Sequence, residues 1–201
     1  MRSDDQLMVA YQAGEAAAFE ALVMRYRRQV FGFLRRLIKD DGLAEDCMLE
    51  TFFKVHRSAA SYEPKGQFKT FLFRIAYHLG LNVLRDGRRW RGLAPLEVQD
   101  DSRGSAVGYQ LELADPTDGP EALLQSRQTV ARLQRGIAEL PEVQRAVFLL
   151  YYQDGLQTGE IAEVVGVPSG SVRAWLSMAR KTLREMLDEQ PLSEPRPSLR
   201  G

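Results

Sequence analysis

Apolar side chains recur at steps of three and four residues over much of this 201-residue chain, and this spacing constrains the fold more than any other feature. One stripe runs from Phe19 to Leu37, over about five helical turns. Similar stripes predict helices from about Ala44 to His56 and from Phe68 to Val83. No alternation of apolar and polar residues is long enough to predict a sheet. The sequence therefore predicts an all-α protein.

A segment of different composition divides the chain in two. Residues 92–121 hold glycines, prolines and acidic side chains with few apolar residues, which predicts a flexible linker. Helical spacing resumes near Pro120, and Pro141 opens a further helix. We expect two small helical domains at residues 1–91 and 122–190, a flexible acidic linker at 92–121 and a disordered, proline-rich tail at 191–201.

The charges are distributed unevenly, although the 27 basic and 27 acidic residues cancel. Residues 1–91 carry 16 Lys or Arg against 11 Asp or Glu, and residues 122–201 carry 10 against nine. Residues 92–121 carry one basic residue against seven acidic ones. Local basic faces set the field that attracts nucleic acid, so the zero net charge does not exclude such a partner. An uneven spread of surface charge without function is the alternative.

Composition excludes several classes of function. Cys47 is the single cysteine, which rules out an internal disulfide framework and a cysteine-based zinc site, and two histidines leave little for another metal site. The apolar runs are too short to span a membrane, and the acidic start MRSDDQL is no signal peptide, so we expect a cytoplasmic protein without membrane insertion.

An enzyme is the weakest of the readings that the sequence allows. No glycine-rich phosphate loop, HExxH or GxSxG pattern occurs. Cys47 lies within a predicted helix and beside acidic residues, which raise the pKa of a thiol and disfavour a nucleophile. We therefore expect no catalytic residues, no cofactor, no metal and no small-molecule substrate.

Residues 155–184 carry the most specific motif, a helix-turn-helix. Residues 160–165 predict a short helix, Gly166 a sharp turn with positive φ, and Ser169 the N-cap of a second helix. One side of that second helix is apolar, while the rest offers hydroxyls and cations that suit the major groove of DNA. The candidates for duplex contact are Ser169, Ser171, Arg173, Ser177, Arg180 and Lys181. A plain helical hairpin with a solvated basic face is the alternative.

The predicted helix that begins at Phe68 offers a second candidate face. Phe73, Arg74, Tyr77, His78, Asn82 and Arg85 lie opposite much of its apolar stripe. Aromatic rings among cations suit single-stranded DNA, because bases stack on the rings while phosphates pair with the arginines. Packing of Phe73 and Tyr77 against a neighbouring helix explains the same pattern equally well.

Asp46 and Glu50 lie four residues apart on the preceding predicted helix. Glu50 can form an ion pair with Lys54 one turn later, which is the ordinary interpretation of a charged helix face. A surface that docks on another protein is the alternative.

Taken together, these segments resemble a bacterial sigma factor of the extracytoplasmic-function (ECF) type, the compact class that keeps only regions 2 and 4. Residues 44–89 are similar to region 2, and residues 140–187 are similar to region 4. The resemblance covers about residues 4–187. It implies a promoter-specificity subunit that binds core RNA polymerase, at the β′ clamp helices and the β flap, and recognises promoter DNA. An anti-sigma factor is a common partner in this class.

The resemblance also implies roles for individual residues. Docking on the β′ clamp helices would fall to Asp46, Leu49, Glu50 and Phe53. Tyr62 would lie in the loop that captures a flipped base of the −10 element. The separated −10 strand and its phosphates would be contacted by Arg74, Tyr77, His78, Asn82, Arg85, Arg88 and Arg89. The helix from Ser169 to Lys181 would read the −35 duplex.

The sequence departs from the family's usual pattern at several of these places. Phe71 stands where Trp is frequent, and His78 stands where Asn is frequent. Ala174 and Trp175 replace a common Ser and Arg, and Gln157 replaces a Ser or Thr that caps the first helix of the motif. We therefore expect this protein to prefer other promoter sequences than its relatives, and we expect a weaker cap on the first helix of the motif. The remaining alternative is a transcriptional regulator that works without polymerase. It assigns no function to the aromatic and basic face of the helix that begins at Phe68.

Overall fold

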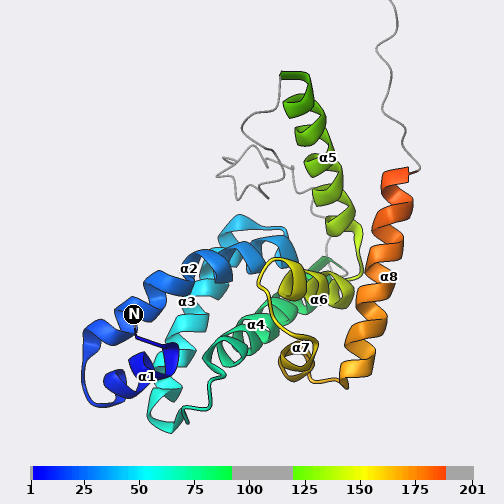
Figure 1. Ribbon diagram of the computed structural model, residues 1–201. Coiled ribbons are helices and arrows are strands. Elements are labelled where there is room, and N and C mark those ends of the chain that lie inside the picture. Colours follow the sequence, from blue (N-terminus) through cyan, green and yellow to red (C-terminus); the bar gives the residue numbers. More distant parts are fainter. Residues whose placement is uncertain (1, 92–119, 189–201) are drawn as a thin grey trace, which may run out of the picture.

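The computed structural model describes the backbone of residues 2–91 and 120–188 and the side chains of residues 2–86 and 128–187. Every regular element in these ranges is helical (Figure 1), which confirms the all-α prediction. None of the described helices is long and apolar enough to cross a membrane. The elements are α1 (Asp4–Gln12), α2 (Ala16–Ile38), α3 (Asp41–Ser58), the 3₁₀ turn η1 (Ala59–Ser61), α4 (Phe68–Arg91), α5 (Pro120–Glu139), α6 (Glu142–Tyr152), α7 (Thr158–Val165) and α8 (Ser169–Asp188).

Helices α1–α4 form one bundle around the apolar stripe of α2. The stripe predicted from the sequence is confirmed, because Leu22, Val30, Phe33 and Leu37 are fully buried. The Phe33 ring meets the Phe73 ring of α4 edge-on, with 5.6 Å between centroids. Each large side chain removed from water contributes about 1.5–3 kcal/mol to folding, so this stripe supplies much of the stability of the bundle.

The ends of α2, α3 and α4 refine the predicted boundaries. Lys39 takes the left-handed conformation that terminates α2, and the Asp40 carboxylate then accepts the Leu43 N–H at 2.8 Å as the N-cap of α3. Helix α3 therefore begins before Ala44 and extends past His56. Helix α4 runs beyond the predicted end at Val83, through Gly87 to Arg91.

Helix α1 precedes Phe19, where the predicted helical spacing begins, and was not predicted from the sequence. A capping box begins this helix: the Ser3 hydroxyl accepts the Gln6 N–H at 3.2 Å, and the Gln6 side chain accepts the Ser3 N–H at 2.8 Å. Met8 is fully buried against the bundle. The helix is thus an integral part of the first domain.

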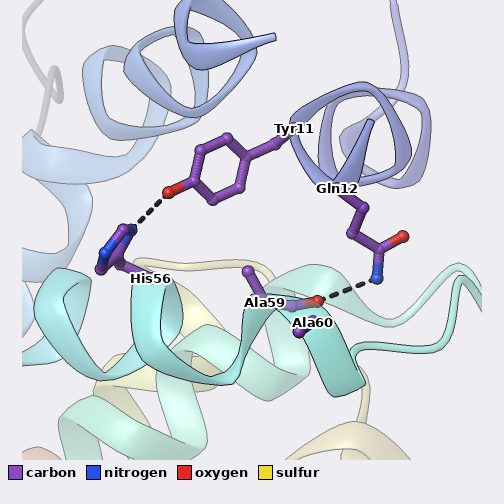
Figure 2. A pocket seen from close by; sticks show the side chains of 5 residues that line it. All are labelled: Tyr11, Gln12, His56, Ala59 and Ala60. Carbon is purple, nitrogen blue, oxygen red and sulfur yellow. Dashed lines mark hydrogen bonds between the residues drawn. The ribbon is translucent and has the colours of Figure 1, made fainter. Parts of the chain in front are cut away.

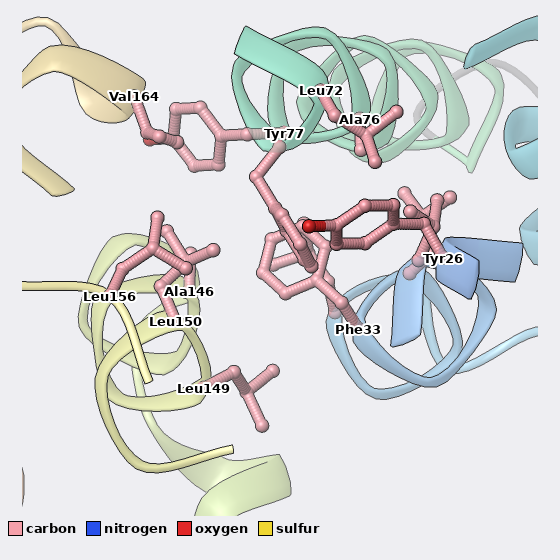
Figure 3. Packing of buried hydrophobic residues seen from close by; sticks show 14 of the residues in the cluster. Tyr26, Phe33, Leu72, Ala76, Tyr77, Ala146, Leu149, Leu150, Leu156 and Val164 are labelled. Atoms are coloured by element: carbon pink, nitrogen blue, oxygen red, sulfur yellow. The ribbon is translucent and has the colours of Figure 1, made fainter. Parts of the chain in front are cut away.

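Helices α5–α8 form a second group that packs directly on the first. Helix α8 runs beside α5, α6 and α7, while α7 contacts α4 and α6 contacts α2 (Figure 1). The buried side chains of both groups form one cluster, in which Leu150 of α6 and Val164 of α7 lie near Phe33 and Tyr77 (Figure 3). The two predicted domains therefore share a core in this structure.

The predicted linker and tail fall almost wholly outside the described residues. Only the last two positions of the 92–121 segment belong to a described element, because α5 begins at Pro120. The tail predicted at 191–201 lies outside the described part of the chain.

Candidate nucleic-acid and polymerase interfaces

The helix-turn-helix motif forms as predicted, with one change at its second helix. Gly166 has a φ of 77° and ends α7 in the left-handed conformation. Ser169 is the first residue of α8 and not its N-cap, because the Pro168 carbonyl before it accepts the Ser171 N–H at 2.9 Å. The expected weak cap at Gln157 is offset, since its N–H donates to the Glu160 carboxylate at 2.7 Å.

Helix α8 buries its apolar side and exposes a basic one. Val172, Leu176, Ala179 and Leu183 are buried, as the sequence predicted. Arg173, Ser177, Arg180 and Lys181 are exposed, and their spacing places them along one side of the helix. The structure therefore brings together four of the six predicted duplex contacts in a continuous strip.

The remaining two predicted duplex contacts differ from each other. Ser169 is half-buried at the start of α8 and, four residues before Arg173, continues the basic strip. Ser171 is half-buried as well, but a step of two residues turns its side chain by about 200° relative to Arg173. The structure does not place Ser171 with the others. Trp175 packs against the core.

Two of the exposed cations of α8 have partners inside the protein. Arg180 Nε donates to the Tyr152 hydroxyl at 2.6 Å, and its guanidinium lies 5.7 Å from the centre of that ring. Lys181 Nζ lies 3.8 Å from the Glu185 carboxylate one turn later. Tyr152 thus orients Arg180 at the side of the strip, a contact that joins α6 to α8.

One face of α3 combines exposed apolar and acidic side chains. Asp46, Leu49, Glu50 and Phe53 are all exposed, and steps of three and four residues place them together. Leu49 keeps 60% and Phe53 keeps 53% of its surface accessible. Large apolar side chains that stay exposed beside each other indicate a surface for another protein. The predicted Glu50–Lys54 ion pair is present at 3.7 Å.

Cys47 lies on the buried side of α3, next to the exposed face, and its surroundings agree with the expectation from the sequence. Burial raises the pKa of the Cys47 thiol, and the nearby carboxylates of Asp46 and Glu50 raise it further. A thiol with a raised pKa is a weak nucleophile.

The predicted aromatic and basic face of α4 separates into two. Phe73 is fully buried against Phe33, and Tyr77 is 2% exposed with its ring directed at α6 and α7 (Figure 3). Both aromatic residues therefore pack against neighbouring helices, which was the alternative interpretation of the pattern. Burial raises the pKa of Tyr77, and Glu142 adds to this effect.

The polar members of that face stay accessible. Arg74, His78, Asn82 and Arg85 are exposed and follow one another along α4 at steps of four and three residues. The side chains of Arg88 and Arg89 lie outside the described residues, although their backbone belongs to α4. A basic strip therefore runs along α4 beside the covered Tyr77.

Phe71 joins two predicted −10 residues that the sequence places apart. Tyr62 lies in the loop between η1 and α4, and its ring centre is 5.5 Å from that of Phe71. The Arg74 guanidinium lies 5.9 Å from the centre of the Phe71 ring on the same helix. Tyr62 and Arg74 thus belong to one aromatic and basic cluster with Phe71 at its centre.

Comparison with known proteins decides the family. Sigma-70 region 2 matches residues 22–91, and Sigma-70 region 4 matches residues 131–183. The RNA polymerase sigma-H factor of Pseudomonas aeruginosa is 30% identical over 189 residues, which cover 94% of this chain and 95% of the relative. The ECF RNA polymerase sigma-E factor of Haemophilus influenzae is 32% identical over 193 residues, covering 94% and 97%. This chain belongs to the ECF sigma factors of the sigma-70 family.

Solved structures of lower identity share the fold of this sigma factor. CnrH, in complex with the cytosolic domain of CnrY, has a TM-score of 0.65 at 23% identity, covering 94% of this chain and all of that one. RpoE from Bartonella quintana, in complex with the anti-sigma factor NepR, has a TM-score of 0.65 at 20% identity, covering 86% and 98%. Sigma factors are transcription initiation factors and not enzymes, so membership of the family confirms the predicted function class.

Proposed function

We propose that this ECF sigma factor docks on core RNA polymerase through the face of α3 formed by Asp46, Leu49, Glu50 and Phe53. The observation that carries this assignment is the exposure of two neighbouring large apolar side chains, Leu49 and Phe53, within the segment that matches region 2. Two carboxylates beside them add charge selectivity to an apolar contact. Docking on the β′ clamp helices buries this face.

Region 4 reads the −35 duplex with the exposed strip of α8. Arg173, Ser177, Arg180 and Lys181 enter the major groove, where arginines bind guanine edges and phosphates. Ser169 supplies a hydroxyl at the start of the helix, as in other helix-turn-helix proteins. Region 4 also docks on the β flap of polymerase, which aligns α8 with the upstream element.

Region 2 captures the −10 strand with the Tyr62 loop and the polar strip of α4. The cluster of Tyr62, Phe71 and Arg74 offers ring faces for a base and a cation for its phosphate. The strip then continues along the strand through His78, Asn82, Arg85, Arg88 and Arg89. Tyr77 joins this surface only when α7 moves away from α4, since α7 covers it in the described arrangement.

The natural setting of this sigma factor is the cytoplasm, where core polymerase and promoter DNA are found. Both solved neighbours are complexes, one with the anti-sigma factor NepR and one with the cytosolic domain of CnrY. We extend the same kind of regulation to this chain, with an anti-sigma factor as its inhibitory partner.

The test measures binding to core polymerase and promoter-directed transcription separately. Fluorescence anisotropy of the labelled chain should show core binding in about the nanomolar range. The double variant Asp46→Ala with Glu50→Ala should bind core more weakly, while an Arg173→Ala variant should bind core normally and transcribe poorly. Tight duplex binding by the chain alone, without binding to core, would support a stand-alone regulator and refute the proposal.

A further inference from the structure

Helix α1 contacts the loop that follows η1 through the carboxylate of Asp5. Asp5 Oδ1 accepts the Tyr62 hydroxyl at 2.6 Å, and Asp5 Oδ2 accepts the Gly66 backbone N–H at 2.5 Å. One carboxylate therefore bonds the first and the fifth residue of the 62–66 segment. Hydrogen bonds to a charged group are about twice as strong as neutral ones, so this contact restrains the loop at two points.

Gln12 at the end of α1 restrains the start of the same loop. Its Nε2 donates to the carbonyl of Ala59 and to the carbonyl of Tyr62, each at 2.8 Å. Figure 2 shows the Gln12 amide reaching from α1 to Ala59 beside a hollow lined by Tyr11, Gln12, His56, Ala59 and Ala60. Three hydrogen bonds from two α1 side chains thus hold the irregular 62–66 segment, and a fourth holds Ala59 of the η1 turn before it.

Helix α1 is itself anchored, so it can act as a rigid support. The Asp4 carboxylate, next to Asp5, contacts the Arg25 guanidinium and accepts the Tyr26 hydroxyl, both from α2. Met8 is fully buried in the bundle. Adjacent carboxylates of α1 therefore bond different elements: Asp4 bonds α2, and Asp5 bonds the loop.

We propose that Asp5 and Gln12 are positioning residues that fix the 62–66 loop in the conformation that captures a −10 base. This inference rests on the proposed role of Tyr62. The Tyr62 hydroxyl is engaged by Asp5 and its ring packs on Phe68 and Phe71, so the position of this half-buried residue is set from α1 and α4. A loop ordered before binding loses less entropy when a base enters it, and it discriminates better between bases.

The experiment measures base discrimination by the holoenzyme. Promoters are first selected from a random library with the wild-type protein, and the best one is then substituted base by base in its −10 element. Transcription from the best promoter relative to the substituted ones gives the discrimination ratio. Asp5→Ala removes two charge-assisted hydrogen bonds and should lower this ratio by about tenfold or more, and Gln12→Ala should lower it by about threefold.

Two controls separate positioning from general stability. Asp41→Ala likewise removes one hydrogen-bonded carboxylate from the first turn of a helix, but this carboxylate bonds Arg35 at 2.8 Å at the start of α3, so the ratio should be unchanged. Affinity for core polymerase should stay at the wild-type value in every variant. Tyr62→Phe keeps the ring and removes only the bond to Asp5, so it should reproduce most of the loss and tests the inference even where Asp5→Ala does not fold.

The outcomes distinguish this inference from the proposed function. The inference that α1 positions the loop would be overturned if discrimination stayed at the wild-type value in Asp5→Ala, Gln12→Ala and Tyr62→Phe. A loss of discrimination in Tyr62→Ala would in that case still support base capture by the loop. Wild-type discrimination in Tyr62→Ala would overturn both. A combined Asp5→Ala and Tyr62→Phe variant that loses no more than either single variant would support the direct coupling of the two residues.

Discussion

The Lys69 ammonium group of α4 donates a hydrogen bond to the backbone carbonyl of Asp154, which lies between α6 and α7. This contact joins region 2 to region 4. Arg36 Nη1 donates to Gln153 Oε1 at 2.6 Å nearby, and the Thr70 hydroxyl lies 3.5 Å from the Glu160 carboxylate. These polar contacts all join region 2 to residues 153–160, so they stabilise the arrangement in which α7 covers Tyr77.

Removing the polar contacts between the regions should loosen region 4. We expect the double variant Lys69→Ala with Arg36→Ala to weaken the packing of the segment between α6 and α7, and with it α7, on region 2 by about 2 kcal/mol, since each net hydrogen bond contributes about 1 kcal/mol. Hydrogen exchange of the α7 amides should then be roughly 30-fold faster. Exchange at the wild-type rate would contradict this expectation, and Arg173→Ala on the exposed side of α8 serves as the control.

Asp154 should make stability depend on pH. Burial raises the pKa of its carboxyl to about 7, although the positive charges of Lys69 and Arg36 act in the opposite direction. An aspartate in the unfolded chain has a pKa of about 3.9. Between these values the folded state keeps a proton that the unfolded state releases, so the contribution of this group to stability falls as the pH rises from about 4 to 7 and is level above that.

Asp154→Asn removes this titration and tests it. The variant should gain stability relative to the wild type as the pH rises, by at most about 1.4 kcal/mol per pH unit within the window. Urea unfolding of both proteins at pH 5 and pH 7.5 measures the difference. An equal pH dependence in the two proteins would show that Asp154 is ionised in the folded state throughout this range.

A larger side chain at Gly80 should destabilise the helical bundle. A Cβ atom at this position would lie 2.9 Å from Leu37 Cδ2 and 3.3 Å from Leu34 Cδ2, and both leucines are fully buried. We expect Gly80→Ala to destabilise the protein by about 1 kcal/mol or more, because overpacking outweighs the better helix propensity of alanine. Gly159→Ala is the matched control, since nothing lies near its Cβ position, and it should stabilise α7 by about 0.5–1 kcal/mol. Thermal unfolding of both variants shows whether each substitution stabilises or destabilises the protein.

The exposed apolar residues of α3 should matter for polymerase and not for folding. We expect Leu49→Ala and Phe53→Ala each to weaken core binding by roughly tenfold or more, because buried apolar anchors dominate interface energies. The unfolding temperature should stay the same, since both side chains are already exposed. Met178→Ala on α8, which is equally exposed at 53%, should leave core binding unchanged. A similar effect from all three substitutions would argue against a specific face.

Arg173 and Ser171 should differ in their effect on the −35 element. Arg173 lies on the exposed strip of α8, whereas Ser171 is turned away from it. We expect Arg173→Ala to weaken recognition of the −35 element by about 1–3 kcal/mol and so to lower promoter-dependent transcription. Ser171→Ala should change it little. Run-off transcription by each variant from promoters with intact and scrambled −35 elements measures this difference. Equal losses in the Arg173→Ala and Ser171→Ala variants would place the reading surface elsewhere on the helix.

Local spacing was sufficient to predict most of the helices and the contacts between neighbouring residues within them. The stripe of α2 is buried where three- and four-residue steps place it, and Gly166 adopts the positive φ that its turn requires. The Glu50–Lys54 pair forms because both residues belong to one helix. These features depend on neighbours within a few residues, which a single sequence shows.

Contacts between distant segments could not be predicted in the same way. Tyr77 is buried because α7, far along the chain, packs on α4, and the pattern around Tyr77 alone fits an exposed ring equally well. Asp5 and Gln12 gain their role only when α1 folds back on the Tyr62 loop. A local signal for α1 does exist in the Ser3 and Gln6 capping box, and it marks where that helix begins.

With the DNA contacts proposed above for α8 and Tyr77, the packing of α7 on α4 would give promoter recognition an order in time. The basic strip of α8 is exposed in this arrangement, so contact with a duplex needs no prior rearrangement. Tyr77 becomes accessible only after α7 departs, so full engagement of a separated strand comes later. Encounter with double-stranded DNA can therefore be fast, while commitment to opening it waits for a slower step inside the protein.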